Sequence, residues 1–123
     1  FFLHPHPAIR DPLWSRGLGD VYKRQLFGST IAHGFLSLSL VPHLTSQAVL
    51  APENLKMVFN YGLDKVRFIN PVNVGSKVRT HSKCVSVDDK GDGRYLMKTE
   101  VTMEIEGVEK PAYIAETLSM FVT

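Results

Sequence analysis

The chain has few of the features that mark disulfide-rich, membrane or secreted proteins. Its 123 residues include one cysteine, Cys84, so no disulfide and no cysteine-based zinc site can form within the chain. No apolar run approaches the roughly 18 residues that a membrane-spanning helix needs. The start of the chain lacks the basic region and the long apolar stretch of a signal peptide. These absences lead us to expect a cytoplasmic protein that does not associate with membranes.

Charge of one sign is also scarce outside the first 25 residues. Those residues hold four basic and two acidic side chains, whereas residues 26–123 hold ten of each, so the formal net charge of +2 arises at the start. A balanced body argues against a nucleic-acid-binding domain. No group of His, Asp and Glu has metal-ligand spacing, and no glycine-rich phosphate loop is present, so we expect no metal and no cofactor.

Residues 1–25 form a segment without regular periodicity. Prolines interrupt it, and neither a helical nor an alternating pattern continues for more than a few residues. Residues 19–25, Gly-Asp-Val-Tyr-Lys-Arg-Gln, resemble a translated sequencing-adapter string found at the ends of some metagenomic reading frames. We therefore expect residues 1–25 to be non-native or disordered, and residues 26–123 to form one partial domain.

One apolar helix is expected after this segment. Residues 28–30, Gly-Ser-Thr, offer a helix N-cap, and residues 31–41 are apolar nearly all round, which predicts a buried helix. Pro42 should end or kink that helix near Val41, and a helical turn or two can follow before Pro52.

The pattern then changes to the alternation of β-strands. Strands are expected at residues 56–61, 63–70, 77–87, 94–106 and 112–122, with turns between them. We predict that Cys84 is a small buried hydrophobe on an inner face. Val78, Thr80 and Ser82 share that face with Cys84. The other expected inner-face residues are Tyr95, Met97, Thr99, Val101, Met103 and Ile105, and in the last strand Ile114, Leu118, Met120 and Val122. A helix that is apolar on all sides must be covered by other elements to be shielded from water. The sequence therefore predicts an α+β fold in which a curved antiparallel sheet surrounds a central helix.

Two motifs resemble one protein family. Residues 27–36, Phe-Gly-Ser-Thr-Ile-Ala-His-Gly-Phe-Leu, resemble the central-helix signature of the MaoC-like dehydratases, relatives of the (R)-specific enoyl-CoA hydratases. Residues 60–68, Asn-Tyr-Gly-Leu-Asp-Lys-Val-Arg-Phe, and the following Pro71-Val72 and Val74-Gly75 are similar to the next strand and turn of that family. The resemblance covers about residues 26–123 and implies a hot-dog fold, here without its first strand, and a homodimer.

The resemblance also implies an activity, the reversible addition of water to a 2-enoyl-CoA, with the coenzyme A thioester as substrate. In that family an Asp and a His five positions later activate the water. This sequence lacks the pair, since Asp11 is followed at that spacing by Arg16 and Asp20 by Gln25. We therefore expect a truncated hydratase domain that is inactive as it stands.

Site residues follow from the same resemblance. Gly34 matches the position whose backbone N–H stabilises the thioester oxygen, although a glycine there can also serve only close packing. His33 is a candidate acid or base, or else a structural histidine. Ile31 and Ser39 are candidate substrate contacts, with a backbone-bonded hydroxyl as the alternative for Ser39. The last candidates, for the phosphates of coenzyme A, are Lys65 and Arg67, which can equally form a solvated strand face.

Two other functions stay open from the sequence. A hot-dog thioesterase needs a carboxylate near the helix start to activate water, but no Asp or Glu lies between Val21 and Pro52. A non-catalytic acyl-CoA-binding or dimerisation module needs no such group.

Overall fold

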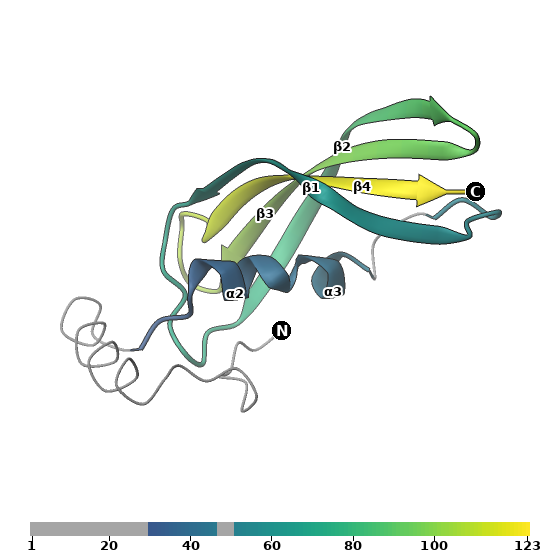
Figure 1. Ribbon diagram of the computed structural model, residues 1–123. Helices are drawn as coiled ribbons and strands as arrows, with labels where there is room; N and C mark the ends of the chain where they lie inside the picture. The colour runs from purple at the N-terminus through teal and green to yellow at the C-terminus, as the bar shows by residue number, and fades with distance from the viewer. Residues whose placement is uncertain (1–29, 47–50) are drawn as a thin grey trace, which may run out of the picture.

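Two short helices and one four-stranded sheet make up the described part of the chain. The computed structural model describes residues 30–46 and 51–123. The elements are α2 (Gly34–Ser39), α3 (Val41–Thr45), β1 (Met57–Phe68), β2 (Val78–Gly91), β3 (Arg94–Ile105) and β4 (Tyr113–Val122). The strands pair antiparallel in the order β1-β4-β3-β2. In Figure 1 the helices lie one after the other along one face of a curved sheet, which confirms the expected α+β architecture.

The helix begins later than the sequence predicted. Residues 30–32 are extended, because the Val74 N–H donates to the Thr30 carbonyl (2.9 Å) and the Ala32 N–H to the Val72 carbonyl (2.8 Å). Those bonds hold the backbone outside the helical region, so the N-cap is His33, with φ −61° and ψ 142°, and no side chain caps it. The prediction of an N-cap at residues 28–30 is therefore wrong.

Pro42 acts on the helix as expected. Helix α2 ends at Ser39, and Pro42 lies in the first turn of α3, where its missing N–H leaves no helical bond unmade. The helical turn expected after the proline is thus confirmed.

Helix α2 is not buried all round. Its Ser37 is buried, but Phe35 is 78% exposed. The sheet covers the helices from one side, so the opposite apolar side chains keep contact with solvent. The expectation of a fully buried helix is corrected to that of a half-buried one.

Strand β1 is one strand where two were expected. It continues through Gly62, and the pairing with β4 shifts between Asn60 and Gly62 and again between Leu63 and Lys65. Each shift is a β-bulge, which adds a residue and bends the strand without ending it.

Strands β2 and β3 form a long hairpin with a two-residue turn. Strand β2 extends to Gly91, beyond the predicted end at residue 87, and Asp92 and Gly93 adopt φ of 55° and 71°. Positive φ at both turn residues is the type I′ geometry that matches strand twist.

Cys84 is exposed, contrary to prediction, because β2 is an edge strand and the core covers only its beginning at Val78.

The inner face of the sheet is confirmed for β3 but not for β4. Val101, Met103 and Ile105 are buried as predicted. In β4 the buried residues are Tyr113, Ala115 and Phe121, whereas Ile114 is 37% exposed. Tyr113 and Ala115 pair with Met103 and Val101, so they must share the inner face with them. The small and polar residues of that face, Ala115, Thr117 and Ser119, made the opposite face look more apolar in the sequence.

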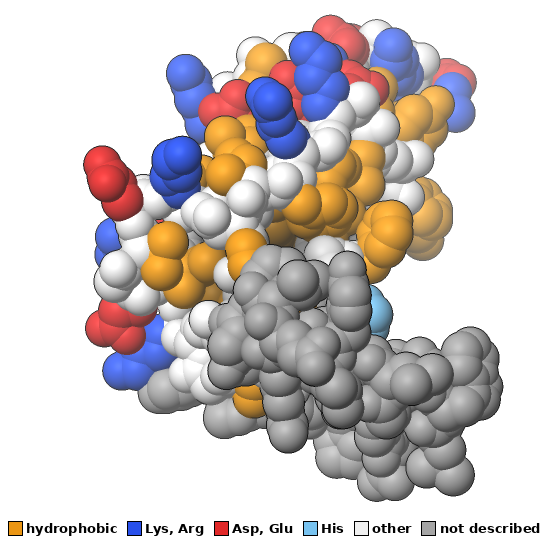
Figure 2. Space-filling model, turned by 90° about the vertical axis from the view of Figure 1, so that its left-hand side faces the viewer, with side chains coloured by type: hydrophobic (Ala, Val, Ile, Leu, Met, Phe, Trp, Pro, Cys, Tyr) orange, Lys and Arg blue, Asp and Glu red, His pale blue; other side chains and the backbone are white. Residues whose placement is uncertain are grey.

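Apolar side chains remain exposed on this structure. Figure 2 shows a band of hydrophobic side chains across one side of the molecule, with charged side chains gathered beyond it. Several of the exposed large apolar side chains belong to strand β1, namely Met57, Val58, Phe59, Tyr61 and Leu63. No helix in the described ranges has the length and apolar character to cross a membrane.

Candidate functional site

A cavity of about 930 Å³ lies between the helices and the inner face of the sheet. Its lining residues come from both helices, from the segment before β1, and from all four strands. Its apolar lining includes Phe35, Leu38, Val41, Leu55, Val58, Met97, Val101 and Phe121. This size and composition suit a small apolar or amphipathic ligand.

The cavity wall carries no acid–base group of the usual kind. Among the described residues that line it there is no Asp, Glu, His, Lys, Arg or Cys, and Tyr61 is its one titratable side chain. Elsewhere in residues 30–46 and 51–123 no three His, Cys, Asp or Glu side chains gather as metal ligands. The described site can therefore bind a ligand but holds no carboxylate or imidazole to activate water.

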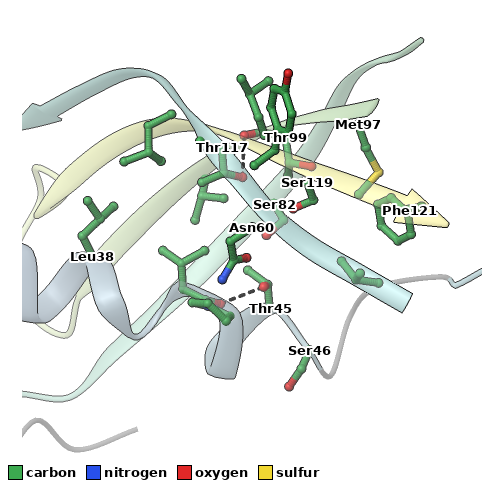
Figure 3. A pocket seen from close by; sticks show the side chains of 18 of the residues that line it. Leu38, Thr45, Ser46, Asn60, Ser82, Met97, Thr99, Thr117, Ser119 and Phe121 are labelled. Carbon is green, nitrogen blue, oxygen red and sulfur yellow. Dashed lines mark hydrogen bonds between the residues drawn. The ribbon is translucent and has the colours of Figure 1, made fainter. Parts of the chain in front are cut away.

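Uncharged polar side chains form a cluster on the sheet side of the cavity. We call Asn60, Ser82, Thr99, Thr117 and Ser119 the polar row. The strand pairing explains the cluster, since Asn60 lies opposite Ser119, and Thr117 lies opposite Thr99. Figure 3 shows Asn60 extending its amide away from β1 and toward α3, with the hydroxyl residues of the polar row close by. The polar row thus meets the cavity midway between apolar walls.

The helix hydroxyls on the other side of the cavity bond to their own backbone. Ser39 donates to the Leu36 carbonyl (2.6 Å), Thr45 to the Val41 carbonyl (2.7 Å) and Ser46 to the His43 carbonyl (2.8 Å). Ser39 does line the cavity, but its hydroxyl proton is already used within the helix.

Gly34 lies against an aromatic ring at the start of α2. A Cβ at this position would lie 2.8 Å from Cε1 of Phe68, closer than real Cβ contacts come. The Phe68 ring in turn packs edge-on between Phe35 and Tyr113, with 6.1 Å between ring centroids in each pair. The glycine therefore permits this close packing, and its backbone N–H belongs to the first helical turn, where no helical acceptor exists.

Tyr113 anchors the sheet to the helix. Its side chain is fully buried, and its hydroxyl donates to the Ser37 carbonyl (3.3 Å). Burial raises the pKa of the Tyr113 phenol well above its ordinary value, because the charged phenolate would be poorly solvated there.

The remaining predicted site residues do not line the cavity. His33 is exposed at the N-cap of α2, and Ile31 forms an isolated bridge with Asn73. Lys65 and Arg67 pair with Glu116 and Ile114, and so lie on the outer face of the sheet, away from the cavity. Of all the predicted site residues, the structure thus brings only Ser39 to the cavity wall, and Gly34 at the helix start is not a lining residue.

Nearby on the outer face, Asp64 and Lys98 form an ion pair between β1 and β3. The hydrogen bond from Lys98 to this carboxylate raises the pKa of the lysine. Asp64 therefore has a partner on the outer face and does not serve the cavity.

The polar row was missed in the sequence because it is assembled from four strands. Each of its residues reads separately as an unremarkable polar side chain within an alternating pattern. The sequence assigned Ser82 and Thr99 to inner faces, but knowledge of the strand register was needed to place Asn60 beside Ser119. If the inner face of β4 had been assigned correctly, its alternation would have placed Thr117 and Ser119 on that face.

Solved structures establish the class of fold. The chain superposes on a structure titled monoamine oxidase regulatory protein, from Archaeoglobus fulgidus, with a TM-score of 0.67 at 22% identity, covering 84% of this chain and 68% of that one. A second protein from the same organism matches with a TM-score of 0.57 at 19% identity, covering 89% and 67%. Together with the helices packed on a curved antiparallel sheet, these matches place the chain in the hot-dog fold.

Sequence comparison then establishes the family. The MaoC-like domain family matches residues 21–107, and the chain belongs to that family. It is 47% identical to 3-hydroxyacyl-thioester dehydratase Z of Mycobacterium tuberculosis, over 78% of this chain and 63% of that protein. It is 35% identical to nodulation protein N of Rhizobium leguminosarum, over 97% of this chain and 67% of that protein. The chain thus spans somewhat under two thirds of the length of the dehydratase relative.

Proposed function

We propose that the chain is the acyl-thioester-binding part of a MaoC-like hydratase or dehydratase, and that its cavity holds the acyl chain of a coenzyme A thioester. The observation that carries this proposal is the cavity of about 930 Å³ between helix and sheet, with apolar walls and no charged group. Apolar walls stabilise an acyl chain by roughly 0.8 kcal/mol for each buried methylene group. The family and the name of the dehydratase relative support a thioester substrate.

Within this proposal Gly34 supplies a backbone N–H to the thioester oxygen, and the start of α2 lies beside the Phe35 side of the cavity. Partial positive charge at a helix start favours charge developing on that oxygen. His33 and Ile31 flank this position along the chain, and their roles stay predictions. Lys65 and Arg67 reach phosphates only if coenzyme A extends around the edge of the sheet at β1.

Hydration itself requires groups that this sequence does not contain. No Asp in the 123 residues is followed five positions later by a His. We therefore expect the chain to bind enoyl-CoA in calorimetric titration but to produce no 3-hydroxyacyl-CoA from crotonyl-CoA. Fusion to a relative's segment that bears the Asp-His pair should restore hydration. A fusion that binds enoyl-CoA without adding water would contradict the assignment.

The thioesterase alternative receives no support from the described cavity, since no carboxylate lines it. Release of free thiol from an acyl-CoA by this chain would favour it. The non-catalytic alternative makes the same binding prediction and differs only in the fusion experiment, where it predicts no restored hydration.

We also propose that the protein is a cytoplasmic homodimer. The exposed apolar side chains of β1 support association, and a single cysteine that is exposed in the structure is compatible with a reducing compartment.

A further inference from the structure

We infer that the cavity selects acyl thioesters whose chain carries an oxygen function, a hydroxyl or keto group, at the level of the polar row. This inference rests on the proposed function, since it specifies which acyl chains the same cavity prefers. It follows from the hydrogen-bonding capacity of the polar row, from the way the rest of the cavity uses its polar groups, and from the cost of covering such groups with hydrocarbon.

The polar row has hydrogen-bonding capacity that the described protein does not use. Thr117 donates to the backbone carbonyl of Thr99 (3.3 Å). Within residues 30–46 and 51–123, the side chains of Asn60, Ser82, Thr99 and Ser119 make no hydrogen bond to protein. An amide offers two donor hydrogens and an acceptor oxygen, and each hydroxyl offers a donor and an acceptor. The cavity therefore presents both donors and acceptors to a ligand.

The helix side of the cavity provides a contrast within the same site. There every hydroxyl that lines the cavity, those of Ser39, Thr45 and Ser46, donates to a backbone carbonyl of its own helix. Their capacity to donate is used, whereas in the polar row only Thr117 donates to a protein group within the described ranges and the other four side chains do not. Among the described residues that line the cavity, the side chains whose donors are available to a ligand therefore lie on the sheet side.

The position of the polar row decides what it can meet. At one end of the polar row Val101 lies opposite Ser82 and leads into the core, and at the other end Val58 and Phe121 border Asn60 and Ser119. A chain that fills the cavity must pass between these apolar regions and over the polar row. A plain alkyl chain would cover the polar groups and displace their water without replacing the lost hydrogen bonds, which costs about 1–3 kcal/mol per group left unpaired. An oxygen function at that level would restore one or two of those bonds. A site that offers hydrogen bonds therefore discriminates against the analogue that lacks the partner.

The test compares dodecanoyl-CoA with hydroxydodecanoyl-CoA thioesters that carry the hydroxyl at successive mid-chain carbons, by calorimetric titration of the whole chain. We expect at least one hydroxylated thioester to bind about fivefold or more tighter than the plain one, equivalent to one hydrogen bond. The variants Thr99→Val and Asn60→Leu should remove that preference, because each takes away a polar group that a plain chain would leave unpaired. Thr102→Val is the matched control, since Thr102 lies on the same strand but on the outer face, opposite Ile114.

The possible results separate the inference from the proposed function. If the plain thioester binds and no hydroxylated one binds tighter, the inference is overturned and the proposed function stands. If no thioester binds at all, both are overturned. If Asn60→Leu weakens free coenzyme A and both thioesters equally, the polar row contacts the pantetheine amides and not the acyl chain, which also overturns the inference. Thermal melting of each variant, matched to that of the parent, confirms that the comparison is made on folded protein.

Discussion

Single residues determine how closely the helix approaches the sheet. Gly34 allows the Phe68 ring to contact the helix backbone, and Tyr113 ties the same region to Ser37 by a buried hydrogen bond. Both residues lie at the end of the sheet where the core is most completely buried. The open cavity begins where this packing ends, so its shape depends on these contacts.

Replacement of Gly34 by alanine should destabilise the fold, although alanine is the better helix former by about 1 kcal/mol. The new Cβ would lie within 2.9 Å of three Phe68 ring carbons, and that ring is held between Phe35 and Tyr113. We expect a loss of about 1–2 kcal/mol in urea unfolding, typical of overpacking. Gly62→Ala is the control, because nothing lies within 4 Å of its added Cβ. If Gly34→Ala is neutral or stabilising, the close-packing explanation is wrong.

Tyr113 should make stability fall at alkaline pH. Its pKa is raised by burial in the folded state, so the unfolded chain releases the phenolic proton first as the pH rises. The stabilisation is complete below the ordinary tyrosine pKa of about 10 and declines above it, by up to about 1.4 kcal/mol per pH unit. Unfolding by urea at a series of pH values measures the slope.

The variant Tyr113→Phe should lose this component of the alkaline slope. It should also cost about 1 kcal/mol at neutral pH, because the bond to the Ser37 carbonyl is removed. An unchanged slope in the variant would assign the alkaline effect to other groups.

At the level of elements, the tight turn between β2 and β3 depends on glycine. Gly93 has φ of 71°, and a Cβ there would lie 2.9 Å from the Thr123 carbonyl oxygen. Gly93→Ala should cost more than the roughly 1–2 kcal/mol of a residue forced into the left-handed region. Gly107→Ala is a matched control, since Gly107 has φ of 77° but open space around it. Equal losses of unfolding free energy in the two variants would show that the contact with Thr123 is unimportant.

The sequence predicted the positions of the strands more accurately than it predicted which of their residues lie on the inner face of the sheet. The alternation in β3 follows a local rule, so this strand was found to within one residue. The hairpin loop was expected at residues 88–93 but is confined to Asp92 and Gly93, because β2 pairs with β3 as far as Gly91. The face of β4 was wrong because its inner-face residues are small or polar. Ala115 fits into the packed core, and Thr117 and Ser119 line the cavity, which inverts the usual pattern. The helix start was wrong because the bonds from residues 30–32 to residues 72–74 are non-local. The candidate site could not be predicted for the same reason, because the polar row can be identified only when the register of all four strands is known.

At the level of the whole molecule, the two edges of the sheet differ in how they resist association. Strand β2 carries charged side chains along most of its length, among them Arg79, Lys83, Asp88 and Asp89, and such charges discourage pairing with another chain. Strand β1 carries no charge from Met57 to Leu63, and its apolar side chains are exposed there. The β1 edge is therefore where we expect two copies of the chain to meet.

Charges introduced on β1 should dissociate such a dimer. We expect the parent chain to show a concentration-dependent dimer in light scattering coupled to size-exclusion chromatography, and Val58→Lys with Phe59→Lys to shift it to monomer. These side chains are about half exposed, so lysine there can remain solvated in the monomer. Val85→Lys is the control, because Val85 is equally exposed but lies on the other edge strand. Dissociation by Val85→Lys and not by the β1 variant would place the interface on β2. A parent chain that is monomeric at every concentration would contradict association through either edge.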